Sequence, residues 1–420
     1  MSDSPATELR LRWAPWWVLA SVALWPLTGP AEAVLSLGAL LALAVLLVNR
    51  FRGGTALLSH EAWALTSVLF LSYWLPELLS APDAFNAPRA WREALLDLRY
   101  LPFLWLVAVS VAQARGRRII LVGLAVITGF WLLDGLVQAA TGWSLGGPAT
   151  ADRLSGVFGA DNLKLGLVLA SLSPFPLIVA ANRFGVGGWL AVAVALVVVV
   201  LLAGSRASWL TLGLALVATG WLQFRARRVV LAAVLAPAVV MLAALAFSDT
   251  LQARFERTAA ALDGGTDGVD HALSGRLPIW RAALDMTLAH PVNGVGVRSF
   301  RDAYPTFARE DDPWLVDAEH GAGYHAHQIV LEVLSETGLL GAFFWLGGGA
   351  LAWRAWRFAT PAARLRARAP ALALAVTVFP FNTHLAVYST FWGGVVLLLF
   401  ALYAGSLLAD DGREPAAGEA

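Results

Sequence analysis

Three short segments of this chain combine side chains that can hold an anion and accept a proton. His325-Ala326-His327-Gln328 carries two histidines, and histidine titrates near neutral pH and can take a proton from a sugar hydroxyl. Arg206 follows Gly204-Ser205 at the expected start of a helix, where unpaired N–H groups and a guanidinium together make an anion site. Arg276 is expected in the first turn of another helix, where a cation opposes the helix dipole and needs an anionic partner.

Each of these segments also has a less specific interpretation. Arg206 could be an interfacial arginine whose side chain reaches lipid head groups. Two histidines at i and i+2 could both ligate zinc in an extended segment, but the sequence has no third ligand beside them and no D-x-D pair. We therefore expect no metal and no cofactor.

Composition indicates the environment in which these side chains work. Of the 420 residues, 58% are hydrophobic and only 14% are charged, whereas a soluble chain carries about a quarter charged residues. This excludes a soluble enzyme, a secreted disulfide scaffold and a disordered chain, and it predicts an all-α polytopic membrane protein. The chain has no cysteine, which removes disulfides and thiolate chemistry.

Long apolar stretches predict the membrane spans. We expect twelve of them, near residues 15–29, 31–49, 61–79, 100–114, 119–141, 164–182, 186–203, 206–223, 229–247, 326–352, 370–387 and 390–408. Arg10 and Arg12 before the first stretch, with Pro30-Ala31-Glu32-Ala33 after it, could alternatively form a cleavable signal peptide. The second stretch follows almost at once, which favours a helical hairpin.

The positive charges predict which side each connection occupies. With both ends in the cytoplasm, 17 of the 30 Lys and Arg residues lie inside, and seven of the other 13 belong to one long outer loop. The chain then divides into spans one to nine (1–247), a helical periplasmic loop (248–324), spans ten to twelve beginning with the histidines (325–408), and a disordered cytoplasmic tail (409–420).

The long outer loop has the pattern of a small helical cap. Leu251, Phe255, Thr258 and Leu262 recur at helical spacing. Ser274 is expected to cap a second helix with Leu277, Trp280, Leu284 and Leu288 on one face. Pro291 should end that helix before the turn Asn293-Gly294-Val295-Gly296, and a third short helix is expected near 299–309.

Ionisable residues within the spans gather toward the outer side. Because such groups are costly in lipid and usually line a cavity, we expect them to form a polar chamber that opens outward. They are Glu77, Asp134, Arg206, His327, Glu332, Glu336 and His384.

The assembled motifs resemble those of the O-antigen ligase family, within the wider O-antigen ligase/polymerase superfamily. His327-Gln328, nine residues and then Gly338-Leu339-Leu340-Gly341 match the family's histidine signature, although Gln stands where Asn is commonest. Arg206-Ala207-Ser208-Trp209-Leu210 matches its R-x-x-x-L element. The run from Ser274-Gly275-Arg276 through Trp280 to Gly294-Val295-Gly296 is similar to the family's periplasmic-loop pattern.

The resemblance implies a metal-independent, inverting glycosyl transfer at the periplasmic face of the bacterial inner membrane. The donor would be a polysaccharide on undecaprenyl diphosphate, the acceptor a sugar of the lipid A-core, and the surrounding partner the lipid bilayer, with no nucleic acid. His327 would be the catalytic base, and Arg206 and Arg276 would bind the diphosphate. His325 and Lys164, the single lysine, are further candidates for substrate contact.

Three alternatives stay open at this point. The same motif occurs in O-antigen polymerases and in protein O-oligosaccharyltransferases, which share the chemistry and differ in the acceptor. A lipid-linked glycan transporter is a third alternative, because any chain with twelve spans could transport. Against it, the polar residues gather on one face, and no pair of broken helices is evident in the sequence.

Overall fold

The computed structural model describes residues 12–54, 56–149, 153–160, 162–225, 228, 235, 275–316, 325–383 and 385–409. Outside the described residues lie the expected ninth span, the first loop helix, Ser274, His384 and the acidic tail. Strand structure in the described ranges is limited to one antiparallel pair, β1 (Trp143–Ser144) with β2 (Gly147–Pro148), next to the short helix η1 (Gly156–Phe158).

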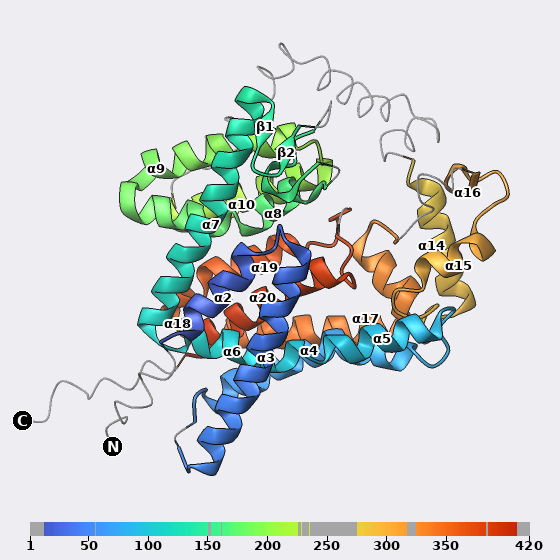
Figure 1. Ribbon diagram of the computed structural model, residues 1–420, viewed down its shortest axis with the longest axis horizontal. Helices are drawn as coiled ribbons and strands as arrows, with labels where there is room; N and C mark the ends of the chain where they lie inside the picture. The colour runs from blue at the N-terminus through green and yellow to red at the C-terminus, as the bar shows by residue number, and fades with distance from the viewer. Residues whose placement is uncertain are drawn as a thin grey trace, which may run out of the picture.

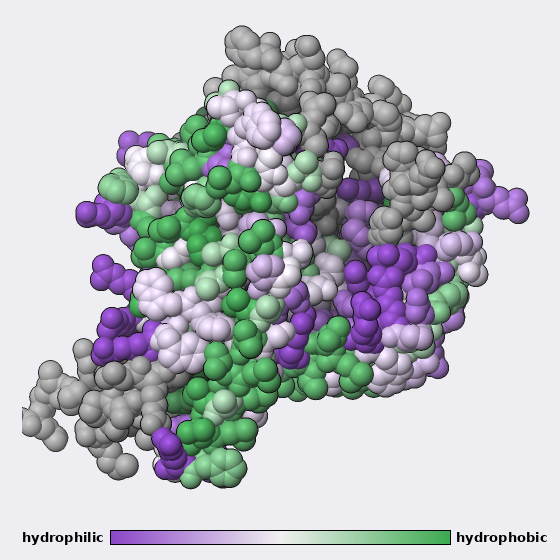
Figure 2. All heavy atoms as spheres, viewed as in Figure 1, coloured by the Kyte–Doolittle hydropathy of each residue, from purple (hydrophilic) through white to green (hydrophobic). Residues whose placement is uncertain are grey.

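Eight of the described helical segments are long and apolar enough to cross a membrane. They are α3 (Thr28–Phe51), α4 (His60–Ser80), α5 and α6 together (Ala87–Ala112), α7 (Ala114–Thr141), α9 (Pro174–Leu202), α10 (Arg206–Phe224), α17 (Ile329–Phe358) and α20 (Thr390–Leu407). The helices α2 (Ala14–Ala23) and α19 (Arg368–Thr377) are apolar but shorter. The protein is therefore an all-α polytopic membrane protein, as its composition predicts. Figure 2 shows hydrophobic surface over the bundle between hydrophilic groups at its two ends.

The sixth and seventh expected spans form a hairpin that is interrupted twice. The first part is α8 (Lys164–Leu172), which is followed at once by α9. Inside α9, Gly185 has φ 64° and ψ −150°, a conformation that favours glycine. A Cβ on Gly166 would lie 3.0 Å from the Cβ of Ala203, although 37 residues of straight helix would span about 55 Å. The chain therefore reverses at Gly185, within the predicted gap between 182 and 186.

The expected tenth span is not one continuous helix. In α17, Gly338 has φ 64° and ψ −162°, and a Cβ on Gly341 would lie 3.3 Å from Cγ1 of Val333. Eight residues of straight helix would separate those two positions by about 12 Å, so the chain folds back at Gly338. We call residues 329–337 the outer arm of α17 and the fold at Gly338 the elbow. The expected tenth span over 326–352 therefore consists of two helical parts, the outer arm and the longer helix after the elbow.

The eleventh expected span is also shorter than predicted. Residues 370–387 are mostly apolar, but α19 ends at Thr377, two residues before the Phe379-Pro380 pair. Proline removes a backbone donor and disfavours a helical residue before it. Residues 378–383 form a non-helical link instead, which we call the α19 link.

The outer loop contains a helical cap, and the face that α14 (Leu277–Ala289) buries is not the face with Leu284 and Leu288. The cap consists of α14, α15 (Phe300–Phe307) and α16 (Pro313–Val316). Arg276, not Ser274, occupies the N-cap position of α14. The residues that α14 buries are Ile279, Ala282, Ala283 and Met286, whereas Leu284 and Leu288 are 49% and 78% exposed. This helix carries two apolar stripes, and the one with smaller side chains packs against α17. The third helix, expected near 299–309, is confirmed as α15.

The helical cap and the arginine-containing helix α18 (Pro361–Arg366) lie at opposite ends of the bundle. Figure 1 shows α14, α15 and α16 at one end of the bundle and α18 at the other. The helix α20 lies at the centre of the bundle. Of its 18 residues, 83% are buried, and it packs against α4, α6 and α19. The sequence analysis missed α5 (Ala87–Asp97), an amphipathic helix that packs against the outer end of α4.

Candidate active site

The two histidines lie side by side immediately before the outer arm of α17. Their ring centroids are 3.8 Å apart, and the ring planes meet at 44°. His327 has φ 51°, a left-handed conformation that is uncommon for a residue with a side chain. A residue held in such a conformation is a candidate for a functional role, because the surrounding structure must stabilise it.

Gln328 fixes the start of this arm with both ends of its amide. Its Oε1 accepts a hydrogen bond of 2.6 Å from the backbone N–H of Leu331, which caps α17. Its Nε2 donates to the carbonyl oxygen of Pro380 at 2.6 Å. Gln328, the residue after His327, therefore ties the arm to the α19 link.

The elbow at Gly338 is held by the turn that follows α14. The N–H groups of Val295 and Gly296 donate to the carbonyls of Ser335 and Glu336, at 2.8 and 3.0 Å. In the opposite direction, the N–H groups after the elbow donate to the cap. Leu339 N–H reaches the carbonyl of Pro291 at 2.8 Å, and Leu340 N–H reaches that of Val292 at 3.0 Å. The backbone groups freed by folding the helix back are thus paired with the cap turn.

This contact joins two motifs that the sequence analysis treated separately. A Cβ on Gly338 would lie 2.3 Å from the carbonyl oxygen of Val292, and one on Gly294 would lie 2.4 Å from the carbonyl carbon of Glu336. Both glycines also have positive φ. The glycines of the histidine signature and of the loop pattern therefore allow one backbone to touch the other.

Arg276 reaches the α19 link from the start of α14. Its Nη1 donates to the carbonyl oxygen of Thr383 at 2.8 Å, so this hydrogen bond leaves its charge uncompensated. Burial, together with the positive charges of Arg206 and Arg153, lowers the pKa of Arg276 to about 10. The guanidinium remains charged at neutral pH.

Arg206 and Arg153 belong to the same region of positive charge. Arg206 is the first residue of α10, after Gly204 with φ 76° and Ser205 in extended conformation, as predicted. Arg153 precedes η1 on the loop after α7 and was not singled out from the sequence. Three neighbouring arginines repel one another, and a multiply charged anion bound between them would offset this repulsion. Both arginines act on Arg276 electrostatically.

The α19 link brings the histidine segment and the arginines together. Pro380 accepts from Gln328, and Thr383, three residues later, accepts from Arg276. The site thus unites side chains from α14, α10 and α17. The resemblance of the motifs places Arg276 and His327 in one site, and residues 378–383 supply the hydrogen bonds that connect their segments.

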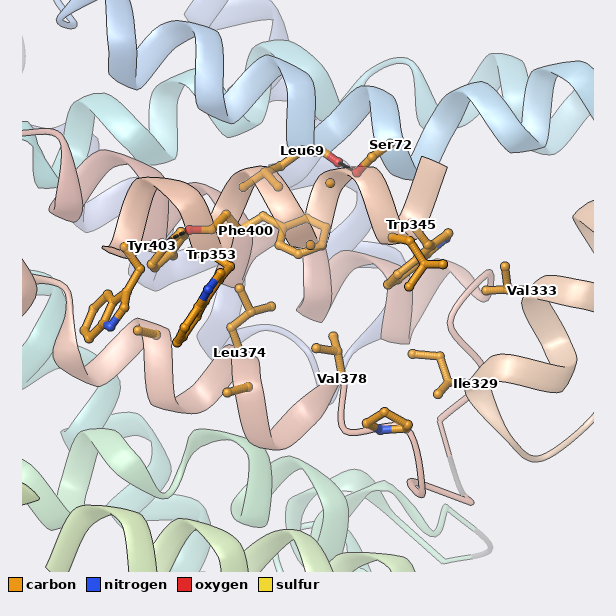
Figure 3. A pocket seen from close by; sticks show the side chains of 18 of the residues that line it. Leu69, Ser72, Ile329, Val333, Trp345, Trp353, Leu374, Val378, Phe400 and Tyr403 are labelled. Carbon is orange, nitrogen blue, oxygen red and sulfur yellow. Dashed lines mark hydrogen bonds between the residues drawn. The ribbon is translucent and has the colours of Figure 1, made fainter. Parts of the chain in front are cut away.

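An apolar cavity of about 660 Å³ begins beside the outer arm and extends between α4, α17, α19 and α20. Ile329, Val333 and Pro380 line one end, and Trp353, Trp356 and Tyr403 line the other. Figure 3 shows Ile329, Val333 and Trp345 toward one end of this cavity and Trp353 and Tyr403 toward the other.

The acidic residues of the expected polar chamber mostly hold loops in place. Glu332 accepts from the N–H of Tyr388 at 3.1 Å, and Glu336 accepts from the N–H of Arg298 at 2.7 Å. Asp134 accepts from the N–H of Leu145 at 2.9 Å, in the hairpin after α7. Glu77 is fully buried. One chamber lined by all the predicted residues is therefore wrong, since these carboxylates serve separate backbone segments.

Lys164 has a different neighbourhood from the arginines. Its Nζ lies 4.3 Å from the ring centroid of Phe391, a cation–π contact. Phe391 also lines a cavity of about 550 Å³, together with Trp25, Arg92 and Arg99. Among the residues that the structure describes, Lys164 does not contact Arg276 or the histidines. Within those residues there is also no group of three His, Asp or Glu side chains arranged to hold a metal.

Residues 191–346 match the protein-family model described as O-antigen ligase. The match covers 156 of the 420 residues, and this part of the chain is similar to the O-antigen ligase family. The matched segment contains Arg206, Arg276, both histidines and the elbow glycines. A search of the curated proteins found no match to the chain. The similarity favours a glycosyltransferase-like enzyme of the O-antigen ligase/polymerase superfamily.

Proposed function

We propose that this protein is an O-antigen ligase. It transfers polysaccharide from undecaprenyl diphosphate to a sugar of the lipid A-core, at the periplasmic face of the bacterial inner membrane. The observation that carries the proposal is the junction of a strained histidine with an arginine cluster, at the mouth of an apolar cavity.

In this proposal the arginines hold the donor and stabilise the leaving group. Arg276 and Arg206 bind the diphosphate, and Arg153 adds a third positive charge. Guanidinium groups pair with phosphate oxygens in a bidentate manner and retain their charge near neutral pH. As the anomeric C–O bond breaks, negative charge grows on the diphosphate, and the arginines stabilise it. Neither a metal nor a general acid is then required.

His327 acts as the general base on the acceptor. As the acceptor hydroxyl oxygen attacks the anomeric carbon, His327 takes the hydroxyl proton and later releases it to water. A single in-line displacement inverts the anomeric centre. The ring of His325, 3.8 Å away, limits the orientations that His327 can adopt.

The apolar cavity suits the lipid tail of the donor. A polyprenyl chain needs a hydrocarbon-lined path beside the diphosphate, and the cavity runs from Ile329 next to the histidine segment to Trp353 and Trp356. Its walls are mainly aliphatic and aromatic, with Ser72 and Arg368 as the polar members, which suits an isoprenoid chain.

The test uses purified protein, polyprenyl-diphosphate glycan and lipid A-core in EDTA, with His327→Ala and Arg276→Lys variants. Product on the core that disappears with His327→Ala supports a metal-independent ligase. Arg276→Lys keeps the charge but not the planar fork, so at least a tenfold loss of transfer is expected, since a bidentate contact is worth about 1.5–3 kcal/mol. Longer carrier-linked chains formed without the core would instead identify a polymerase. Unchanged transfer by His327→Ala would exclude it as the base.

A further inference from the structure

The cap helix α14 presents an exposed apolar edge. Leu284 and Leu288 lie one turn apart on the same side of the helix, and Val292 follows in the turn after it. All three side chains are exposed, Leu288 the most. We call these three residues the apolar edge. Contact between so much hydrocarbon and water is unfavourable, so the edge is suited to an apolar environment.

Polar groups border this edge on two sides. Arg281 and Asp285, four residues apart, form the next exposed stripe around α14. Directly after Val292, the side chain of Asn293 donates to Oδ2 of Asp83 at 3.2 Å. A narrow apolar stripe between charged groups is typical of a helix that lies in the interface between a membrane and water.

The apolar edge continues onto the lipid-facing surface of α17 at the elbow. The carbonyl oxygen of Val292 accepts from the N–H of Leu340 at 3.0 Å, so the cap turn lies against the first residues after the elbow. There Leu339 is exposed, and so is Phe343, one turn further along the membrane helix. Figure 1 shows the cap helices at the end of α17, against which α14 packs. One apolar surface therefore runs from the membrane helix to the cap.

The length of α17 after the elbow indicates how deep this surface lies. Residues 339–353 contain no charged side chain, and Arg354 is the first charged residue that follows. At 1.5 Å per residue this stretch spans about 22 Å, whereas the hydrocarbon core of a bilayer is about 30 Å thick. The hydrocarbon layer must then extend roughly 8 Å past the elbow, which brings it to the cap turn.

We propose that the apolar edge of α14 is inserted into the membrane leaflet on the side of the cap. Its three side chains lie among the acyl chains, and Arg281 and Asp285 stay at the level of the head groups. The lipid thereby supports the cap turn that pairs with the elbow. The proposal does not depend on the glycosyl-transfer activity, because insertion is measured without either substrate.

The absence of cysteine from the chain allows a direct test. A single introduced cysteine can carry a nitroxide label in the full-length protein, reconstituted in phosphatidylcholine vesicles. Leu284→Cys and Leu288→Cys test the edge, and either one suffices if the other does not fold. Asp285→Cys is the matched control, an exposed polar position on the same helix, and Phe343→Cys marks the lipid-facing side of α17.

Electron paramagnetic resonance would compare relaxation of each label by oxygen, which concentrates among acyl chains, with relaxation by a water-soluble nickel chelate. We expect oxygen to dominate at positions 284 and 288, as at 343, from a depth of about 5–10 Å below the phosphates. The chelate should dominate at position 285.

Equal access of the chelate to positions 285 and 288 would overturn the proposal, because the edge would then lie in water. Shielding of position 288 from both reagents would overturn it too. In that case, spin–spin broadening that disappears on dilution with unlabelled protein would identify a second copy as the occupant, and no broadening would identify another segment of the chain.

Discussion

Replacing Gly338 with alanine should disconnect the cap from the outer arm of α17. The new Cβ would lie 2.3 Å from the carbonyl oxygen of Val292 and 2.6 Å from the N–H nitrogen of Asn293, so the cap turn must move. Those atoms belong to backbone, which cannot rotate away as a flexible side chain could. The φ of 64° adds strain of about 1–2 kcal/mol for any residue with a Cβ.

The magnitude follows from the hydrogen bonds at the elbow. Four backbone bonds cross it, two in each direction, and each contributes about 1 kcal/mol. If moving the turn breaks two of them, the total with the strain is about 3 kcal/mol, which corresponds to roughly a hundredfold increase in local opening. Because His327 lies two residues before the outer arm, transfer activity should fall in proportion to the fraction of molecules in which the elbow is open.

Hydrogen exchange of the amides of Val295, Gly296, Leu339 and Leu340 measures this opening directly. Gly347→Ala is the matched control, because it lies further along α17 and a Cβ there would meet nothing within 4 Å. Slow exchange at these amides in Gly338→Ala, with full activity, would refute the reasoning. Equal effects of both substitutions would refute it as well, since the elbow would then not be the cause.

Three further predictions concern the groups around the elbow. Arg276 has a lowered pKa of about 10, so its affinity for diphosphate, measured by calorimetry, should weaken as the pH rises through about 10. The free energy of unfolding should not fall over the same pH range, because the buried cation disfavours folding while it is charged. Tyr304→Phe removes the hydrogen bond of 2.9 Å to Asp312, so the free energy of unfolding should fall by about 1–3 kcal/mol and hydrogen exchange in α15 and α16 should become faster. Unchanged exchange would contradict a structural role for this bond. Gln328→Glu keeps an oxygen that can cap α17 but cannot donate a hydrogen bond to Pro380. We expect kcat to fall about tenfold with little change in melting temperature. An unchanged kcat would show that the bond to Pro380 does not position His327.

The sequence predicted the parts of the fold that depend on local pattern. Long apolar stretches identified most membrane helices, and the Gly-Ser-Arg run correctly marked Arg206 as the start of α10. Helical spacing also identified α15. These signals are local, because span length and helix starts follow from neighbouring residues.

The failures came from long-range contacts. Apolar composition runs through Gly338, so hydropathy did not mark the elbow. The largely apolar run over 370–387 outweighed Pro380, the local signal that α19 ends at Thr377. The sequence showed one apolar face of α14, with Leu284 and Leu288, but could not show that the neighbouring stripe of Ile279, Ala282, Ala283 and Met286 is the buried one. Arg153 was missed because a lone arginine in a loop has no pattern until tertiary structure brings it near Arg276.

The elbow also determines how this enzyme can be recombined with relatives. The cap turn and the outer arm exchange donors in both directions, so each supplies partners that the other needs. A chimera that imports only a foreign loop, with its ends cut between α14 and α17, would pair a turn and an arm that never evolved together. Grafting should succeed only when residues 291–296 and 335–340 travel as one unit. Any attempt to alter glycan preference through the outer loop must therefore inherit part of the membrane helix with it.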